Sequence, residues 1–326
     1  MEGTTEHMTA SMAEKSTAEK RDKIEVSSKR PGKPRNDSPA TKSASKNARF
    51  AKGADIAPRE AVEINLRTLL QAGVHFGHQT SRWNPAMAPY IYGARNGIHI
   101  LNLPKTVTAW DDAKKKIAEV AARGGNVLFV GTKKQAQDVI VEEARRCGAF
   151  YVSRRWLGGM MTNFQTIRKS IERLNKIEQT LVDEEASLAK GEGSRFTKKE
   201  RLMMSKEREK LDYSLGGIRD MYGPPQLMFV IDVKREDIAI KEAQRLDIPV
   251  VALVDTNCDP SSIDFPIPSN DDGTRAIRLF ASAISDTIIE SRKKFSGNTE
   301  KTVASTTVAN TVVPVTVVEQ QEAKNS

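Results

Sequence analysis

The chain has 326 residues, of which 38% are hydrophobic, enough for one large domain or two small ones with a buried core. No apolar run of roughly 18 residues or more occurs, so we expect no membrane-spanning helix, and the first residues do not resemble a secretory signal peptide. The net charge of +9 is compatible with a polyanionic partner without requiring one. Two distant cysteines, Cys147 and Cys258, argue against a disulfide framework or zinc ribbon and favour a reducing cytoplasm.

Both ends of the chain lack the hydrophobic periodicity of folded elements. Residues 1–58 are rich in Ser, Thr, Ala, Lys, Glu and Pro, and we predict a disordered basic N-terminal extension because such a segment buries too little apolar area to offset its chain entropy. Its acidic residues argue against the rival interpretation, an organelle transit peptide. Residues 297–326 are predicted to form a disordered C-terminal tail, with a stray strand left open by their valines.

The ordered part is expected to begin near Arg59, with a short helix that carries Leu66, Leu69 and Leu70 and ends at Gly73. A loop punctuated by Gly and Pro follows, up to Asn96. Apolar runs then predict strands at 97–103, 126–131, 149–153, 227–232 and 249–255, and helices at 106–123, 132–147, 236–246 and 273–294. Such alternation indicates an α/β fold, with a mostly parallel sheet covered by helices on both faces, formed by 59–162 and 218–296.

Residues 163–217 interrupt the alternation of strands and helices. Apolar side chains recur there at intervals of three and four: Phe164, Ile167, Ile171, Leu174, Ile177 and Leu181. Gly191 and Gly193 mark a turn, and a second helix is predicted from about Thr197 to Leu215. Two such helices predict a coiled-coil helical hairpin, which we expect to protrude from the sheet because its outward faces are charged.

One strand-to-helix turn stands where α/β enzymes bind phosphate, at Gly131-Thr132-Lys133-Lys134. Neither the P-loop nor the dinucleotide-binding fingerprint occurs in the sequence, so a plain turn with solvent-facing lysines, phosphate contacts to RNA and a mononucleotide site all stay open. Asp232 and Asp255 follow consecutive buried strands, where they could bind Mg²⁺ or could cap loops and helices. A nucleotide-binding α/β enzyme is therefore the alternative function.

Basic residues interleaved with aromatics and glycines are more typical of RNA binding, because guanidinium groups and rings stack on bases while glycines let the backbone approach phosphates. The histidines of the Gly-rich loop favour packing or RNA contact over a metal site. Residues 195–210 hold seven basic against three acidic side chains, which indicates phosphate contact. The predicted RNA-binding residues are His75, His78, Arg82, Trp83, Arg95, Lys105, Lys133, Lys134, Arg154, Arg155, Lys198, Lys199 and Arg201.

Between about residues 62 and 293 the sequence contains a series of long, specific motifs: Leu69–His78, Arg82–Pro85, Gly93–Ile100, Phe129–Lys133, Arg155–Met160, Thr162–Phe164, Ser214–Ile218 and Val254–Pro260. Through these motifs the chain resembles the family of bacterial small-subunit ribosomal protein two. Two features depart from the family pattern: residues 1–58 are additional, and Ser153-Arg154 replaces a more usual Asn-His pair, which puts any contact of that pair in doubt.

The resemblance implies a flavodoxin-like parallel sheet sandwiched by helices, with a protruding coiled-coil hairpin. It implies a structural, non-enzymatic constituent of the cytoplasmic small ribosomal subunit, bound to small-subunit rRNA between head and body near the mRNA exit. Neighbouring small-subunit proteins are implied partners, including ribosomal protein one, whose recruitment links the chain indirectly to mRNA. No catalytic residue, cofactor, metal, membrane or small-molecule substrate is expected.

Overall fold

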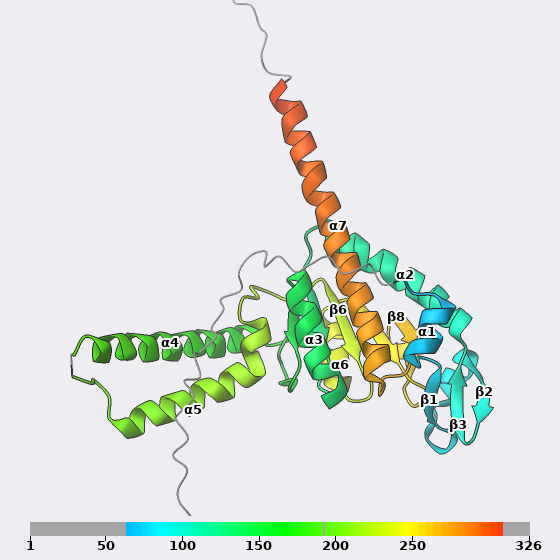
Figure 1. Cartoon of the computed structure of the whole chain (residues 1–326), viewed down its shortest axis with the longest axis horizontal. Helices are drawn as coiled ribbons and strands as arrows, with labels where there is room; N and C mark the ends of the chain where they lie inside the picture. The colour runs from blue at the N-terminus through cyan, green and yellow to red at the C-terminus, as the bar shows by residue number, and fades with distance from the viewer. Residues whose placement is uncertain (1–62, 192, 309–326) are drawn as a thin grey trace, which may run out of the picture. The chain divides into compact units, whose positions relative to one another are not determined.

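The computed structural model describes residues 63–191 and 193–308, with side chains described as far as Phe295. The predictions for residues 1–58, and for the tail beyond Val308, lie outside these residues. Five parallel strands, of which Figure 1 labels β6 and β8, form the central sheet in the order β5-β4-β6-β7-β8. The strands are β4 (Val127–Val130), β5 (Phe150–Val152), β6 (Leu227–Ile231), β7 (Val250–Val254) and β8 (Phe265–Pro268). This is the flavodoxin-like order, and the predicted α/β class is confirmed.

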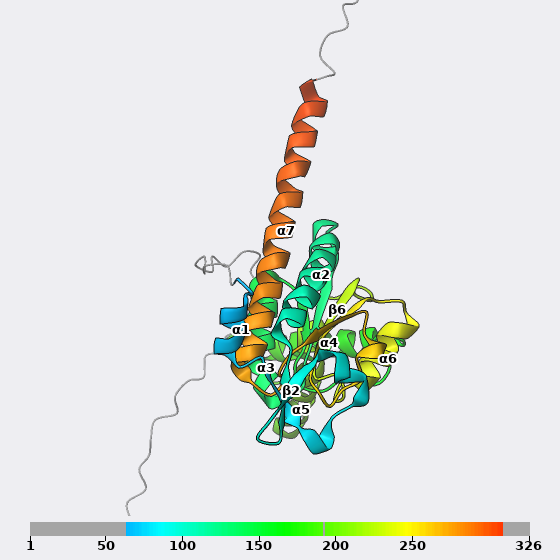
Figure 2. The ribbon, with the colours of Figure 1, turned by 90° about the vertical axis from the view of Figure 1, so that its right-hand side faces the viewer.

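Helices cover both faces of the sheet. One face carries α1 (Leu66–Ala72), α2 (Leu103–Ala122), α3 (Lys134–Cys147) and α7 (Thr274–Val308), and the other carries α6 (Asp237–Arg245). Figure 2 shows α6 on the opposite side of β6 from α2, α3 and α7. Because side chains alternate along a strand, neighbouring residues of one strand enter two different apolar clusters.

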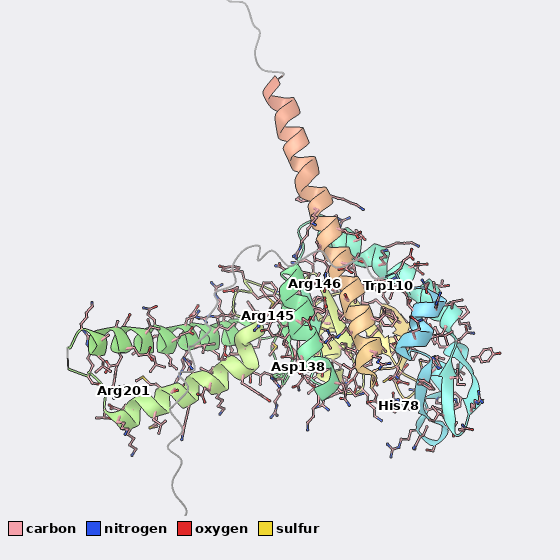
Figure 3. The ribbon with its side chains drawn as sticks, viewed as in Figure 1. His78, Trp110, Asp138, Arg145, Arg146 and Arg201 are labelled. Carbon is pink, nitrogen blue, oxygen red and sulfur yellow. The ribbon has the colours of Figure 1, made fainter. Side chains whose placement is uncertain are left out.

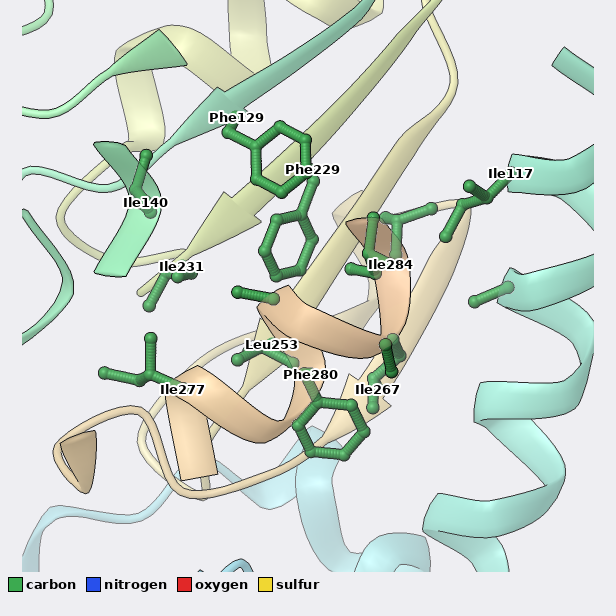
Figure 4. Packing of buried hydrophobic residues seen from close by; sticks show 14 of the residues in the cluster. Ile117, Phe129, Ile140, Phe229, Ile231, Leu253, Ile267, Ile277, Phe280 and Ile284 are labelled. Atoms are coloured by element: carbon green, nitrogen blue, oxygen red, sulfur yellow. The ribbon is translucent and has the colours of Figure 1, made fainter. Parts of the chain in front are cut away.

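The side chains of β4 illustrate this two-sided burial. Phe129 points toward α3 and α7 and meets Phe229 of β6 edge-on, with ring centroids 5.5 Å apart (Figure 4). Leu128 and Val130, on either side of Phe129 in sequence, pack into the cluster beneath α6. All four residues of β4 are buried, which explains why the strand is a continuous apolar run instead of an alternating one.

Strand β8 was not predicted from the sequence, because its residues Phe265-Pro266-Ile267-Pro268 contain two prolines. Proline cannot donate to a ladder, so its presence argues against a central strand. In the structure β8 pairs only with β7 in this sheet and lies at its edge, where the missing N–H groups cost no ladder bond. A strand of this composition is readable as an edge strand once the others are placed.

A second, antiparallel sheet precedes the sandwich and corrects two predictions. Its strands are β1 (Phe76–Gln79), β2 (Ile91–Arg95) and β3 (Ile98–Leu101), in the order β1-β3-β2. The predicted loop up to Asn96 therefore contains two strands, and the strand predicted at 97–103 belongs to this sheet and not to the parallel one. Asn96 and Gly97 have φ of 53° and 74°, the geometry of a two-residue hairpin turn that Asn-Gly favours. The short helical turns η1 (Thr80–Arg82) and η2 (Pro85–Tyr90) connect β1 to β2.

Two long helices, α4 (Phe164–Ala189) and α5 (Lys198–Leu215), lie between β5 and β6 in sequence and pack against each other. Ile167, Ile171 and Leu174 of the predicted apolar stripe are buried. Thr197 and Glu200 form a capping box that begins α5, each side chain accepting from the backbone N–H of the other residue. The 3₁₀ turn η3 (Gly216–Ile218) then leads back to the sheet, and another, η4 (Pro260–Ser262), follows β7.

The last helix, α7, continues to Val308, well beyond the end predicted at Lys294. The first residues of the predicted C-terminal tail are therefore helical. The helix includes Gly297, which is tolerated because a glycine inside a helix costs only about 1 kcal/mol and removes no backbone hydrogen bond, unlike proline. Within residues 63–191 and 193–308, no helix is both long and apolar enough to cross a membrane.

Gly217 is the glycine at which α5 returns against the edge strand β5. A Cβ atom there would lie 2.1 Å from the backbone oxygen of Tyr151, which cannot move without disturbing the strand. We expect Gly217→Ala to lower the free energy of unfolding by about 2 kcal/mol, because the clash forces the backbone to shift. Urea denaturation measures this, with Gly223→Ala as control, since a Cβ at Gly223 meets no atom within 4 Å. Equal stability of the two variants would contradict the close approach.

Candidate nucleic-acid interface

The predicted RNA-binding residues do not gather in a single site. They fall on the antiparallel sheet and its connections, the start of α2, the turn between β4 and α3, the loop after β5, and the start of α5. Whether a residue of each segment can contact RNA depends on whether its charged group is exposed or is already paired within the protein.

In the turn between β4 and α3, the polar groups of Thr132 are hydrogen-bonded to side chains from elsewhere in the protein. Thr132 donates from its backbone N–H and its hydroxyl to Glu236 Oε1, at 2.9 and 2.5 Å, and its hydroxyl accepts from Arg235 Nε at 2.7 Å. Burial raises the pKa of Glu236, an effect that the bonds from Thr132 oppose. The Glu236 carboxylate thus occupies the amide of Thr132, just before the N-cap of α3, and its negative charge beside the turn disfavours a bound mononucleotide. Lys134, the first residue of α3, is exposed.

Lys133 is enclosed by carboxylates. Its Nζ lies 2.8 Å from Asp271 Oδ1, 2.7 Å from Asp272 Oδ1 and 3.5 Å from Asp232 Oδ2, and its side chain is only 13% exposed. Burial alone would lower the pKa of Lys133, but the hydrogen bonds to Asp271 and Asp272 raise it above its ordinary range. Lys133 thus serves the fold, and its placement argues against the predicted contact with RNA phosphate.

The same cluster explains Asp232 and Asp255. Asp232 accepts from the backbone N–H of Arg235, and Asp255 accepts from the backbone N–H and hydroxyl of Thr256, so both cap loops as one of the two interpretations has it. Burial, followed by the charges of Asp255 and Asp232, raises the pKa of Asp271 to about 7. Lys133, whose Nζ lies near both Asp271 and Asp232, provides the positive charge that compensates these neighbouring carboxylates.

His78 joins this cluster from β1. Its Nδ1 lies 3.0 Å from Asp255 Oδ2 and its Nε2 lies 3.3 Å from Asp272 Oδ2. The bond to Asp255 raises the pKa of His78, while burial opposes the rise. One potential metal-ligand atom from each of His78, Asp271 and Asp272 lies within 4.8 Å of the others. Such a set of nitrogen and carboxylate ligands could bind either a divalent cation or the ammonium group of Lys133. His78 is therefore engaged inside the protein.

The antiparallel sheet carries the other loop residues. His75 packs on Phe76 with ring centroids 4.0 Å apart, and burial lowers the pKa of His75. Trp83 is 40% exposed, and its ring centroid lies 5.3 Å from that of His99. The remaining predicted residues, Arg82 and Arg95, are exposed, and Lys105 is exposed with its Nζ donating to the carbonyl of Pro89.

The loop after β5 is organised by a buried carboxylate that the sequence analysis did not identify. Glu242, on α6 and 6% exposed, accepts through Oε1 from Trp156 Nε1 at 3.0 Å and from the Gly159 N–H at 2.7 Å. Its Oε2 accepts from the Met161 N–H at 2.9 Å, the Thr162 N–H at 3.0 Å and the Thr162 hydroxyl at 3.1 Å. Burial alone would raise the pKa of Glu242, but these bonds bring it below its ordinary value.

This carboxylate fixes the conformation from which Arg154 and Arg155 extend. Trp156 is buried, as its apolar character favours, while both arginines before it are exposed. Arg154 donates to Gln137 Oε1, and its Cζ lies 5.4 Å from the centroid of the Tyr213 ring. The loop thus holds one apolar anchor inside and two cations outside.

A second carboxylate, Glu184, shapes the turn between α4 and α5. It is 3% exposed and accepts from the Ser194 hydroxyl and the Arg195 N–H. The bond from Ser194 lowers the pKa of Glu184, and the charge of Arg201 also lowers it. Arg201 is half-buried beside this turn (Figure 3), whereas Lys198 and Lys199, in the first turn of α5, are exposed.

The comparisons with known proteins agree with this fold. Residues 69–291 match the family model described as Ribosomal protein S2. A relative named Small ribosomal subunit protein uS2 from Mesorhizobium japonicum is 55% identical over 228 residues, 70% of this chain and 85% of the relative. A relative of the same name from Brucella anthropi is 58% identical over 222 residues, 68% of this chain and 84% of the relative. The flavodoxin-like α/β chain belongs to the ribosomal protein S2 family.

Proposed function

We propose that the chain is a structural constituent of the small subunit of the cytoplasmic ribosome, and that it binds small-subunit rRNA between head and body. In this proposal it also helps to recruit ribosomal protein one, and through it mRNA. Family membership supports the structural role. The observation that carries the RNA contact is that buried carboxylates hold two cationic segments in shape: Glu242 holds the loop that presents Arg154 and Arg155, and Glu184 holds the turn before Lys198 and Lys199.

The role proposed for each predicted residue follows from whether its charged group is paired within the protein or exposed to solvent. Lys133 and His78 are bound to carboxylates of the protein, so the proposal assigns them to the fold. The exposed cations remain as phosphate contacts: Arg82, Arg95, Lys105, Lys134, Arg154, Arg155, Lys198 and Lys199. Contacts of this kind position a protein on RNA without reading its bases. Residues 163–217 act in the proposal as a hairpin that extends the contact beyond the sheet.

Reversing two exposed charges at the start of α5 tests the hairpin's part in binding. We expect Lys198→Glu with Lys199→Glu to weaken binding to small-subunit rRNA by roughly tenfold. The salt dependence of binding should also become shallower, because a protein that makes fewer phosphate contacts releases fewer counterions when it binds. Filter binding across a salt series measures both, together with incorporation into reconstituted small subunits. The matched control is Lys114→Glu with Lys115→Glu, which makes the same charge change at two exposed positions of α2. If both pairs lose affinity equally, net charge and not the hairpin determines binding.

The alternative, a nucleotide-binding enzyme, has a simple test. Glu236 already accepts from the Thr132 amide in the turn before α3, so we expect ATP, GTP and NAD to leave the thermal unfolding midpoint unchanged. A large shift with one nucleotide would favour the enzyme.

A further inference from the structure

The surface where α5 returns to the sandwich holds an arginine that is fixed in place. Arg154 follows β5 and donates through Nη1 to Gln137 Oε1 on α3. Gln137 is itself oriented, because its Nε2 donates to the carbonyl of Thr132 at 2.8 Å. The Arg154 guanidinium lies over the ring of Tyr213 on α5, 5.4 Å from its centroid. The flexible side chain of Arg154 is thus contacted from two elements of the fold, α3 and α5.

Tyr213 is not needed by the core. Its neighbours Leu211 and Leu215 face the sandwich and pack in the cluster beneath α6, whereas the Tyr213 side chain is 60% exposed. A helix residue two positions from each of these leucines points away from them. The Tyr213 ring therefore presents an exposed aromatic surface beside the planar cation of Arg154.

The charges around this ring suit a nucleic acid. Lys206 and Lys210 stand seven and three positions before Tyr213, so they share its face of α5, and both are exposed. Arg155 is exposed next to Arg154, and Glu209 is the acidic residue of that face. Cations flanking an exposed ring are the combination by which proteins bind unpaired nucleotides, with the base stacked on the ring and the phosphates near the cations. A double helix cannot use the ring, because its bases are already stacked on each other.

We propose that Tyr213 and Arg154 form a stacking site for one unpaired base of RNA, with Arg155, Lys206 and Lys210 near the adjoining phosphates. The inference rests on the proposed binding of small-subunit rRNA and assigns one recognition element within it. The guanidinium covers part of the ring and extends its planar surface, and the Gln137 bond fixes the geometry before RNA arrives, which limits the entropy lost on binding.

The experiment compares chemical reactivity of each nucleotide in small subunits reconstituted with the full chain or with its variants. Tyr213→Leu keeps apolar bulk but cannot stack, so one unpaired base should become about tenfold more reactive, within the range that loss of one aromatic stack gives. Tyr213→Phe and Tyr213→Trp keep the ring and should preserve the protection. The matched control is Tyr222→Leu, since Tyr222 is 83% exposed and lies outside the described ring contacts with arginine. Ultraviolet cross-linking of the wild-type subunit should join Tyr213 to that same nucleotide.

The outcomes separate this inference from the proposed function. If Tyr213→Leu enters the subunit and leaves every nucleotide as protected as the wild type does, the stacking site is wrong while rRNA binding stands. A cross-link from Tyr213 to a protein instead of RNA also overturns it. If the wild-type chain neither enters the subunit nor protects any nucleotide, the proposed function itself fails. Thermal unfolding of each variant should stay near that of the wild type, because the ring is exposed.

Discussion

Glu242→Ala is expected to lower the free energy of unfolding by about 3–5 kcal/mol, among the largest effects for a single side chain of this protein. The substitution leaves the indole N–H of Trp156 and the backbone N–H groups of Gly159, Met161 and Thr162 without their acceptor in a region closed to water. Each orphaned buried donor carries a desolvation penalty of its own. Urea denaturation followed by circular dichroism measures the loss.

Two variants sharpen the interpretation. Glu242→Gln keeps one carbonyl oxygen but places an NH₂ group against donors, so it should recover only part of the stability. Lys241→Ala, on the same helix with a side chain 67% exposed and paired with Asp237, which is 57% exposed, should change stability by less than about 0.5 kcal/mol. If Glu242→Ala is no more destabilising than Lys241→Ala, the carboxylate does not hold the loop.

The stabilisation from Glu242 should also depend on pH. Its pKa in the folded protein lies below the ordinary value of 4.5, so the folded state binds its proton less readily than the unfolded chain. Its contribution is therefore complete above about pH 4.5 and is lost as the pH falls through the folded pKa. The stability difference between wild type and Glu242→Gln should accordingly shrink on acidification, and a difference that grows would contradict the assignment.

The elements of the sandwich could be predicted because each has a strong local signal. The apolar run 126–131 and the glycine after Cys147 mark β4 and the end of α3 whatever the rest of the chain does. Elements with conflicting local signals were not predicted correctly. The prolines of β8 argued against a strand, although β8 is an edge strand. The hairpin signal Asn96-Gly97 was divided between a predicted loop and a predicted strand. There, the sheet as a whole decides the structure.

The candidate site was less predictable, because availability of a charge depends on residues distant in sequence. The motif at Trp156–Gly159 was recognised, but its partner Glu242 lies on another helix and resembles any surface glutamate in sequence. Likewise, Tyr213 belongs to no recognisable sequence motif, and only its contact with Arg154 in the fold marks it as a candidate RNA-binding residue. A sequence displays which residues are charged, but the fold decides which of those charges remain free to meet RNA.

Lys133→Met provides the second large expected effect, and it separates the two roles that a lysine at this turn can have. Removing the ammonium leaves Asp271, 1% exposed, and Asp232 without their cation, and breaking such a buried pair from one side costs about 3–5 kcal/mol. We expect a comparable loss in urea denaturation. Lys134→Met, at the exposed neighbouring position, should leave stability unchanged and weaken rRNA binding.

The double variant Lys133→Met with Asp271→Asn tests the cause of that loss. If the penalty comes from uncompensated carboxylates, neutralising Asp271, which contacts the lysine Nζ at 2.8 Å, should restore part of the stability, giving a coupling of about 1 kcal/mol or more. Simple additivity of the two substitutions would mean that the ion pair is not what stabilises this turn. Were Lys133 instead a phosphate ligand, its removal would weaken rRNA binding while leaving unfolding unchanged, the pattern expected here for Lys134. The two adjacent lysines thus act as each other's control: one holds the carboxyl ends of the strands together, and the other faces the solvent from which RNA would approach.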